Sequence, residues 1–376
     1  MQDDVTRAVL AREDVGRYMK ASDGLSKVEA RERIQAYLDE LRTTQRHSIY
    51  RALKHPLYPI LRKIDRIGEG AAIARRATDA GRVLYVSNHK SHLDYLIEPL
   101  ILEDHAIRPP VIAAGINLFG GPLGILHRHV TGAIPIRREA KDPAYLVTLK
   151  AYISEILKRH DVFYYPEGGR SYSGEIKSPK TGLLHAAMQA EEAGLVIVPV
   201  AVSYDIVLED SVLAHQGAKR RQRPFALELA EMVGAAVGYQ SRAFVTFGEP
   251  IPLGDWDPHS RRDILRLAKQ TLEIIGRLYK VLPTAVVAAA MRPAIRRADL
   301  LGHVARHVET LVAGGANMDS TDPRAIVARG VELLADRGIV VRERDAIRVR
   351  DRHTLRYYAR TLDHLLAPAK RTARTH

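Results

Sequence analysis

The sequence predicts an α/β protein with a mixed, mostly parallel sheet flanked by helices. Between residues 79 and 256, short runs rich in β-branched and aromatic residues alternate with helix-length stretches, which is the order that builds a largely parallel sheet. Helix-favouring segments precede and follow this part. A length of 376 residues suggests two or three structural units. Hydrophobic residues make up 46% of them, which is enough apolar surface for a folded protein.

Residues 1–78 are expected to form a helical segment at the start of the chain. Apolar residues recur at helical spacing, as at Val28, Ile34, Leu38 and Leu41, and glycine is scarce. We therefore expect the first unit of the chain to be helical.

The stretch 41–68 of this segment is strongly basic. It carries seven Lys and Arg residues and one acidic residue, interleaved with Tyr, Leu and Ile. A basic amphipathic helix is typical of contact with an anionic bilayer. The same pattern also describes an ordinary docking helix with a solvated basic face, and the sequence leaves both interpretations open.

Residues 79–256 form the second predicted unit, which contains the sheet. The expected strands are 82–87, 111–114, 132–136, 162–165, 195–202 and 243–247. Pro199 lies inside one of them and predicts an edge position or a local kink, because proline cannot donate to a strand ladder. A basic loop at 219–223 is interpreted as a solvated surface turn.

Residues 257–376 form the third predicted unit, which is mostly helical. Helices are expected at 261–281, 284–313 and 323–337, followed by a β-hairpin of 339–344 with 346–350 and a last helix at 353–366. This order is similar to the wing of a winged helix. Because no recognition helix is evident, DNA binding is not favoured.

The charge of the chain indicates an anionic partner. Fifty-seven Lys and Arg residues against 44 Asp and Glu residues give a net charge of +13, which attracts nucleic acid, an acidic membrane or phosphorylated substrates. The absence of cysteine excludes disulfides, cysteine-ligated metals and thiol catalysis and fits a reducing compartment. No run approaches the roughly 18 apolar residues of a spanning helix, and the N-terminus lacks the pattern of a signal peptide.

The segment YVSNHKSHLDYL, residues 85–96, carries the first candidate site. A strand is expected to end at Ser87 and a helix to begin near Ser91, so that His89 lies at the carboxyl end of a strand, where open α/β sheets bind ligands. One helical turn would return the carboxylate of Asp94 to the imidazole. Such a pair supplies a general base.

Two other interpretations of this segment are open. His89 and Asp94 are also compatible with simple capping of a turn. His89, His92 and Asp94 are compatible with a metal site, although His92 is expected to point away from the other two.

The segment VFYYPEGGRSYSG, residues 162–174, follows a second predicted strand. Its paired glycines, Gly168 and Gly169, permit close approach of a ligand to the backbone. Arg170 offers a planar fork suited to phosphate, and Glu167 is placed to hold that arginine or to accept a substrate hydroxyl. A further strand, GAIPIRR, ends in Arg137 and Arg138, which alone would be solvated strand-end arginines.

Together these blocks resemble the glycerolipid acyltransferase superfamily. The matching residues are His89–Tyr95, Ala113–Leu118, Ile136–Arg138, Glu167–Ser171 and Pro179–Gly182. The individual residues within these blocks are similar to those of the bacterial glycerol-3-phosphate acyltransferases and the related dihydroxyacetone-phosphate enzymes. The resemblance covers about residues 80–255 and implies an acyltransferase-type fold for the sheet unit.

The resemblance implies transfer of a fatty acyl group from acyl-carrier protein or coenzyme A to the sn-1 hydroxyl of glycerol 3-phosphate, in phospholipid biosynthesis. It implies neither metal nor cofactor and no covalent intermediate. By this resemblance His89 is the base and Asp94 orients it, whereas the acceptor is bound by Arg137, Arg170 and Ser171 at its phosphate, by Glu167 and Gly168 in the pocket wall, and by Lys180 as a further contact. Lys90 departs from the arginine that the family often carries there.

Two alternatives accompany this hypothesis. In the first alternative the acceptor is dihydroxyacetone phosphate or lysophosphatidic acid. In the second the chain is a nucleic-acid or partner-binding protein on an inactive acyltransferase scaffold. The intact His89 and Asp94 pair argues against the second. We expect a cytoplasmic enzyme, peripheral on the inner face of the cell membrane, whose partners include an anionic membrane surface and no nucleic acid.

Overall fold

A computed structural model describes residues 2–21, 26–43, 64–116, 132–137, 140–190, 192–215 and 241–367. Its centre is an eight-stranded sheet in the order β1-β7-β6-β2-β5-β3-β4, with β8 paired to β6. The strands are β1 (Ile64–Glu69), β2 (Val83–Ser87), β3 (Val111–Gly115), β4 (Ile134–Ile136), β5 (Val162–Tyr164), β6 (Val196–Tyr204), β7 (Ser241–Phe247) and β8 (Ile251–Pro252). All neighbours are parallel except β7 and β8 against β6, so the predicted mixed, mostly parallel sheet is confirmed.

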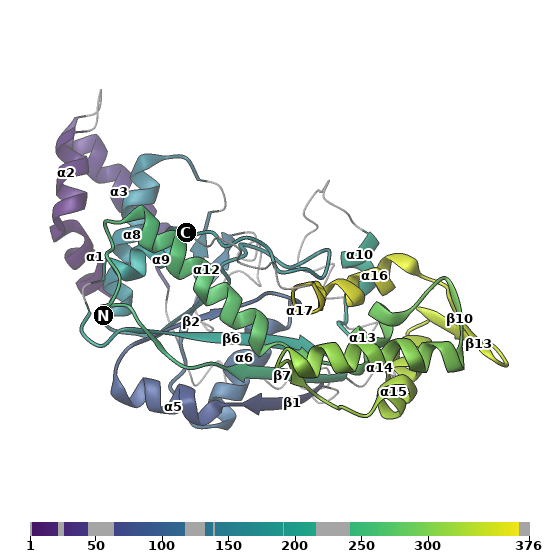
Figure 1. The fold of residues 1–376 in the computed structure, drawn as a ribbon. Helices are drawn as coiled ribbons and strands as arrows, with labels where there is room; N and C mark the ends of the chain where they lie inside the picture. Colours follow the sequence, from purple (N-terminus) through teal and green to yellow (C-terminus); the bar gives the residue numbers. More distant parts are fainter. Residues whose placement is uncertain are drawn as a thin grey trace, which may run out of the picture.

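Helices cover both faces of the sheet (Figure 1). On one face lie α5 (Ala71–Ala80) and α6 (Asp94–Asp104), and on the other α8 (Pro143–Leu157), α9 (Gly182–Met188) and α12 (Arg261–Leu278). Strand β2 alternates between the two cores, since Val83 and Tyr85 join the first and Leu84 and Val86 the second. A strand buried on both faces reads as a continuous apolar run, and this is how its sequence reads.

The N-terminal part begins with three helices that pack against α8: α1 (Gln2–Ala11), α2 (Glu13–Ala21) and α3 (Lys27–Leu41). The expectation of helix up to residue 78 is wrong for residues 64–69, which form the edge strand β1. Its partner β7 begins 177 residues later, with Ile64 opposite Ser241, so local periodicity carries no signal for this pairing. Most of the basic stretch 41–68 lies outside the described residues, as does the loop 219–223.

Of the two alternatives predicted for Pro199, an edge position and a local kink, the edge position is wrong. Strand β6 is central, with β2 on one side and with β7 and β8 on the other. The ladder with β7 ends at Val200 and Phe247, and the ladder with β8 begins at Ile197 and Ile251. Pro199 therefore sits between two ladders, where its missing N–H group is not needed, and its carbonyl accepts a hydrogen bond from Gly248 N at 2.8 Å.

The C-terminal part forms its own cluster of elements at the end of the sheet opposite the N-terminal helices (Figure 1). Its elements are β9 (Lys280–Val281), α13 (Pro283–Ala290), β10 (Ala294–Arg296), α14 (Arg297–Ala313), β11 (Asn317–Met318), α15 (Pro323–Asp336), β12 (Val340–Arg342), β13 (Ala346–Val349), α16 (Arg352–Arg360) and α17 (Asp363–Leu366). The predicted hairpin is confirmed as β12 and β13, and β10 pairs with β13 as a third strand.

Two predicted helices of this part are interrupted. The helix expected at 284–313 is divided into α13 and α14, because Pro293 follows α13 and cannot continue a helical ladder. The helix expected at 353–366 is divided into α16 and α17. Periodicity alone did not reveal either break.

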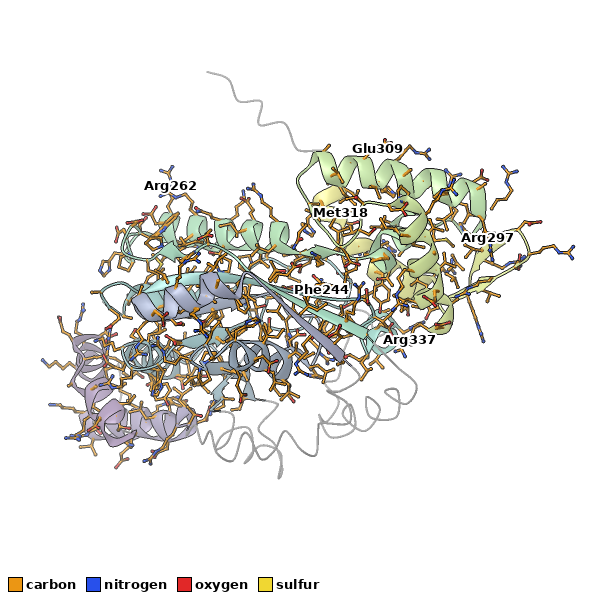
Figure 2. The ribbon with its side chains drawn as sticks, turned by 90° about the horizontal axis from the view of Figure 1, so that it is seen from below. Phe244, Arg262, Arg297, Glu309, Met318 and Arg337 are labelled. Atoms are coloured by element: carbon orange, nitrogen blue, oxygen red, sulfur yellow. The ribbon has the colours of Figure 1, made fainter. Side chains whose placement is uncertain are left out.

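The C-terminal part packs on the residues that follow β6. Thr284 Oγ1 donates to Asp205 O at 2.7 Å, and Val207 N donates to Tyr358 Oη at 2.9 Å. Figure 2 shows side chains filling the space between the helices and the sheet, with Phe244 in the sheet layer and Arg262 on the outer side of α12. Among the described helices, none has both the length and the apolar character needed to cross a membrane.

The contact between α13 and α15 requires a glycine, which gives a testable prediction. A Cβ atom on Gly330 would lie 2.6 Å from Pro283 O, so Gly330→Ala should lower the free energy of unfolding by about 1–3 kcal/mol. The matched control is Gly302→Ala on α14, where the nearest atom is the flexible Arg306 Nη1 at 3.9 Å and alanine should add about 0.5–1 kcal/mol. Urea unfolding measures both, and a stabilised Gly330→Ala protein would contradict this packing.

Candidate active site

The His89 and Asp94 side chains meet at the carboxyl end of β2. His89 Nδ1 lies 2.8 Å from Asp94 Oδ2, and the same oxygen accepts hydrogen bonds from Lys90 N at 2.7 Å and Ser91 N at 3.0 Å. Tyr204 Oη donates to the other oxygen at 2.6 Å. Asp94 is the first residue of α6, so the turn itself, and not one turn of helix from Ser91 as predicted, brings the carboxylate to the imidazole.

The Asp94 carboxylate sets the tautomer of His89. A carboxylate accepts the Nδ1 proton, which leaves Nε2 as the basic nitrogen. Burial lowers the pKa of His89 below its usual value, although the hydrogen bond and the charge of Asp94 oppose this effect. A pKa below the usual histidine value favours the neutral imidazole, which is the form that accepts a proton.

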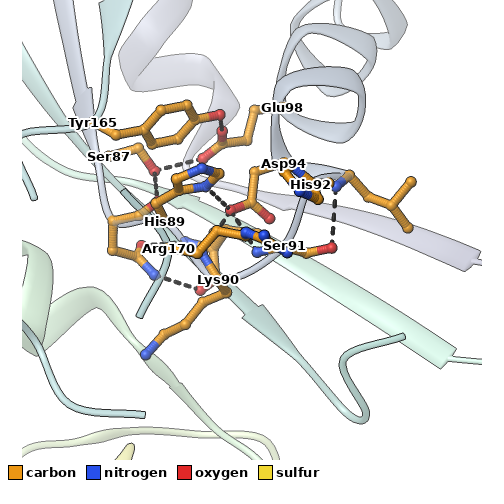
Figure 3. A network of polar contacts seen from close by, with 12 residues as sticks. Ser87, His89, Lys90, Ser91, His92, Asp94, Glu98, Tyr165 and Arg170 are labelled. Carbon is orange, nitrogen blue, oxygen red and sulfur yellow. Dashed lines mark hydrogen bonds and ion pairs between the residues drawn. The ribbon is translucent and has the colours of Figure 1, made fainter. Parts of the chain in front are cut away.

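A tyrosine ring stacks on the other side of this imidazole (Figure 3). The ring centroids of His89 and Tyr165 are 4.3 Å apart with an interplanar angle of 16°. Tyr165 Oη donates to Glu98 Oε2 at 2.6 Å, and Ser87 Oγ donates to Glu98 Oε1. The pKa of Glu98 is raised well above its ordinary value, mainly because the group is buried and also because of the nearby charge of Asp94.

These supporting residues were missed in the sequence. Tyr165 directly follows β5, and Glu98 is a carboxyl group within the otherwise apolar stretch 96–102 of α6. A buried charge in an apolar helix was the available signal, because such a group needs partners.

Residues 165–180, which follow β5 and are called the acceptor loop below, lie against the His89 turn. Glu167 Oε1 accepts from His89 N at 3.2 Å and its Oε2 accepts from Lys177 N at 3.1 Å, while Ser171 N donates to His89 O at 2.9 Å. Burial raises the pKa of Glu167, with Lys90 opposing the shift. The structure thus brings His89, Glu167 and Ser171 together.

Gly168 and Lys180 also meet in this loop. Gly168 has φ +68°, and a Cβ atom there would lie 2.9 Å from Lys180 Cδ, so only glycine permits this approach. Lys180 N donates to Pro166 O at 2.8 Å. Both predicted residues therefore lie beside Glu167.

Arg170 is buried and held by an acidic residue that the sequence analysis missed. Arg170 Nη1 lies 3.3 Å from Glu209 Oε1. Glu209 also accepts from Ser91 Oγ and from His92 N at 2.7 Å. Glu209 follows the sheet strand β6 in a segment without a local motif, so only the fold shows its partner.

Arg137 lies apart from this cluster. It follows the edge strand β4, three places from β2 in the sheet order, which corresponds to about 14 Å at the usual strand spacing. Its guanidinium forms two hydrogen bonds with Glu40 on α3 and lies 5.1 Å from the ring of Tyr37. Arg138 is outside the described residues, and acceptor binding by Arg137 stays a prediction.

Lys90 points away from the His89 and Asp94 pair (Figure 3). Its Nζ atom donates to Gly174 O at 2.7 Å and lies 4.9 Å from the centre of the Tyr279 ring. Burial lowers the pKa of Lys90 to about 8. Lys90 thus ties the turn after β2 to the acceptor loop.

The metal interpretation of His89, His92 and Asp94 is not supported. In the part of the chain that the structure describes, no group of three or more His, Asp or Glu side chains is arranged to hold a metal ion.

Comparisons with known proteins confirm the resemblance seen in the motifs. Residues 69–203 match the family model described as Acyltransferase. The glycerol-3-phosphate acyltransferase of Aeromonas hydrophila subsp. hydrophila is 31% identical over 245 residues, which cover 62% of this chain and 30% of that protein. The protein of the same name from Glaesserella parasuis serovar 5 is 34% identical over 238 residues, which cover 60% of this chain and 29% of that protein.

The match therefore spans about 30% of the length of these relatives. Among solved structures, the 1-acyl-sn-glycerophosphate (LPA) acyltransferase PlsC from Thermotoga maritima is similar, with 17% identity and a TM-score of 0.35, covering 72% of this chain and 84% of that one.

The geometry of the His89 and Asp94 pair predicts how His89 titrates. Because burial disfavours the imidazolium, His89 should titrate below the usual histidine pKa of about 6.5. Asp94→Asn should lower that pKa further, since the carboxylate opposes the effect of burial. An NMR titration of the imidazole, assigned with His89→Gln, measures both values. A pKa of His89 that rises in Asp94→Asn would contradict the pairing.

Proposed function

We propose that this chain, whose residues 69–203 match the Acyltransferase family model, transfers a fatty acyl group from a thioester donor to the sn-1 hydroxyl of glycerol 3-phosphate. The observation that carries the proposal is the His89 and Asp94 pair, with a separation of 2.8 Å, next to the buried Arg170 loop. The relatives named glycerol-3-phosphate acyltransferase support this choice of acceptor.

In the proposed step His89 acts as the general base. Nε2 accepts the proton of the acceptor hydroxyl as its oxygen attacks the thioester carbonyl carbon. The tetrahedral intermediate collapses, the carbon–sulfur bond breaks, and the thiolate takes the proton from the imidazolium. Asp94 stabilises that imidazolium, because its carboxylate lies on Nδ1. The step needs no cofactor beyond the thioester.

The acceptor phosphate is proposed to bind at the loop after β5. Arg170 supplies the donors, Lys180 adds a positive charge, and Glu167 and Gly168 shape the wall beside His89. Ser171 donates its N–H group to His89 O and its hydroxyl to Glu175 O, so it contributes to phosphate binding only if its hydroxyl leaves Glu175. A guanidinium matches the geometry of a phosphate with paired hydrogen bonds. In this scheme Arg137 contributes only if it leaves Glu40.

The acyl donor is proposed to be acyl-carrier protein or coenzyme A. A net charge of +13 suits an acidic carrier protein and the phosphates of coenzyme A alike. Assays with each thioester separate the two donors.

We propose that the enzyme works in phospholipid biosynthesis, peripherally at the inner face of the cell membrane. Its proposed product carries a fatty chain that partitions into a bilayer, and the basic stretch 41–68 favours an anionic surface.

The first functional prediction concerns the catalytic pair. His89→Ala and Asp94→Asn should each lower kcat for glycerol 3-phosphate by about 10²–10⁴-fold, because proton transfer loses its base or the tautomer of that base. The assay uses radiolabelled glycerol 3-phosphate with both donors and determines the acylated position. Circular dichroism and thermal unfolding check that the variants fold.

Activity that survives either change would overturn the mechanism. Competition among glycerol 3-phosphate, dihydroxyacetone phosphate and lysophosphatidic acid identifies the acceptor. A wild-type protein that acylates no acceptor but binds duplex DNA with steep salt dependence would indicate an inactive scaffold.

The second functional prediction concerns the acceptor phosphate. Arg170→Ala should reduce the preference for glycerol 3-phosphate over glycerol, measured as the ratio of their kcat/KM values, by about 10–100-fold, the usual worth of a charge-assisted hydrogen bond. Arg108→Ala is the control, because Arg108 pairs with Asp161 at the amino ends of the strands, away from the candidate site. An unchanged ratio in Arg170→Ala would place the phosphate elsewhere.

A further inference from the structure

Glu209 connects the two segments that carry the candidate site. Its carboxylate accepts hydrogen bonds from Ser91 Oγ at 3.0 and 2.9 Å, from His92 N at 2.7 Å, and from Arg170 Nη1 at 3.3 Å. The first two donors belong to the turn of the catalytic pair, and the third belongs to the acceptor loop. Glu209 lies outside the region 69–203 that matches the family model.

This contact is buried, so it fixes an orientation. Arg170 is 8% exposed and Glu209 is 6% exposed. A buried charge that loses its partner is left uncompensated, which makes alternative positions of the arginine costly. A guanidinium carries its five N–H donors in one fixed plane, so the contact with Glu209 sets the direction in which all of them point.

Asp210, the residue after Glu209, is held by side chains of the C-terminal part. Asp210 is completely buried and accepts from Arg337 Nη2 at 2.7 Å and from Tyr358 Oη at 2.7 Å. Arg337 Nη2 also donates to Leu208 O at 2.7 Å. Figure 2 shows Arg337 between the strand ends and the C-terminal helices. The residues before and after Glu209 are therefore held by Arg337, the residue that follows α15, and by Tyr358 of α16.

The C-terminal part also contacts the acceptor loop directly. Gly174 has φ +87°, and a Cβ atom there would lie 2.0 Å from Tyr357 O on α16. Arg360 of α16 pairs with Glu175, whose carbonyl accepts from Ser171 Oγ at 2.7 Å. Two independent contacts thus join α16 to the residues proposed to bind phosphate.

We infer that Glu209 is a positioning residue for the acceptor. It holds Arg170 in the orientation that meets the acceptor phosphate, and the C-terminal part (residues 283–367) holds Glu209 through Asp210. This inference rests on the proposed function, and it gives the C-terminal helices a role in acceptor binding.

The test combines steady-state kinetics with a double-mutant cycle. Glu209→Ala should raise KM for glycerol 3-phosphate at least tenfold, change kcat less than threefold and leave KM for the donor unchanged. Glu209→Gln keeps the shape and an acceptor oxygen, so its rise in KM should be smaller. In an Arg170→Ala background, Glu209→Ala should add less than a twofold change, because the two residues act as a unit.

Asp210→Asn should raise the same KM without a change in the donor KM. Its matched control is Asp161→Asn, which alters a completely buried aspartate paired with Arg108 at the amino ends of β2 and β5. The control should lower the melting temperature and leave both KM values unchanged. This comparison separates a loss of stability from a loss of arginine position.

The inference is overturned if Glu209→Ala has the same effect with and without Arg170, or if it lowers kcat alone. If Glu209→Ala does not fold, the same cycle is measured with Glu209→Gln. Calorimetric binding of glycerol 3-phosphate provides an arm without turnover. Wild-type protein that binds it but acylates nothing contradicts the proposed function. Binding by Glu209→Ala that is as tight as binding by wild type, while Arg170→Ala binds more weakly, contradicts the role of Glu209.

Discussion

The side chain of Asp94 has no exposed surface, and a carboxylate removed from water must receive hydrogen bonds or a positive charge to persist. Its donors come from the turn after β2 and from Tyr204 at the end of β6. The turn can supply two backbone N–H groups only by folding around the carboxylate, and this folding carries the ring of His89 onto the same oxygen. The position of the base is therefore a consequence of satisfying Asp94, and it requires β2 and β6 to be neighbours.

A second buried carboxylate, Glu98, lies on the same helix, and the two differ in what surrounds them. Asp94 receives hydrogen bonds from backbone N–H groups and pairs with a histidine. Glu98 receives hydrogen bonds only from hydroxyl groups, and burial together with the charge of Asp94 raises the pKa of Glu98. Neighbouring carboxylates in a medium of low dielectric constant divide the roles in this way. Tyr165 stacks on His89 with its ring and donates to Glu98 with its hydroxyl, whereas the carboxylate whose charge acts on His89 is that of Asp94.

Sequence reasoning succeeded where the determinants are local. The strand runs, the hairpin and the pairing of His89 with Asp94 depend on residues close together in the chain. It failed where the determinant is a distant partner: β1 is a strand because β7 lies beside it, and Pro199 is tolerated because two ladders meet there. Arg137 was grouped with Arg170 through the family resemblance, since its strand alone predicted solvated arginines. The sheet order places their strands apart, and Glu40 pairs with Arg137. Glu209 and Asp210 carry no motif at all.

The net charge of +13 indicated an anionic partner, and the described arginines near the site are each paired with a carboxylate. Arg170 is bound to Glu209, Arg337 to Asp210 and Arg360 to Glu175. A bare arginine would attract any anion over a distance set by the ionic strength. An arginine that is buried and paired with a carboxylate attracts distant anions only weakly. It instead presents its N–H donors in a fixed direction. Selectivity for a phosphate at this edge of the sheet would then arise from geometry, and the carboxylates that appear to oppose anion binding are the groups that supply it.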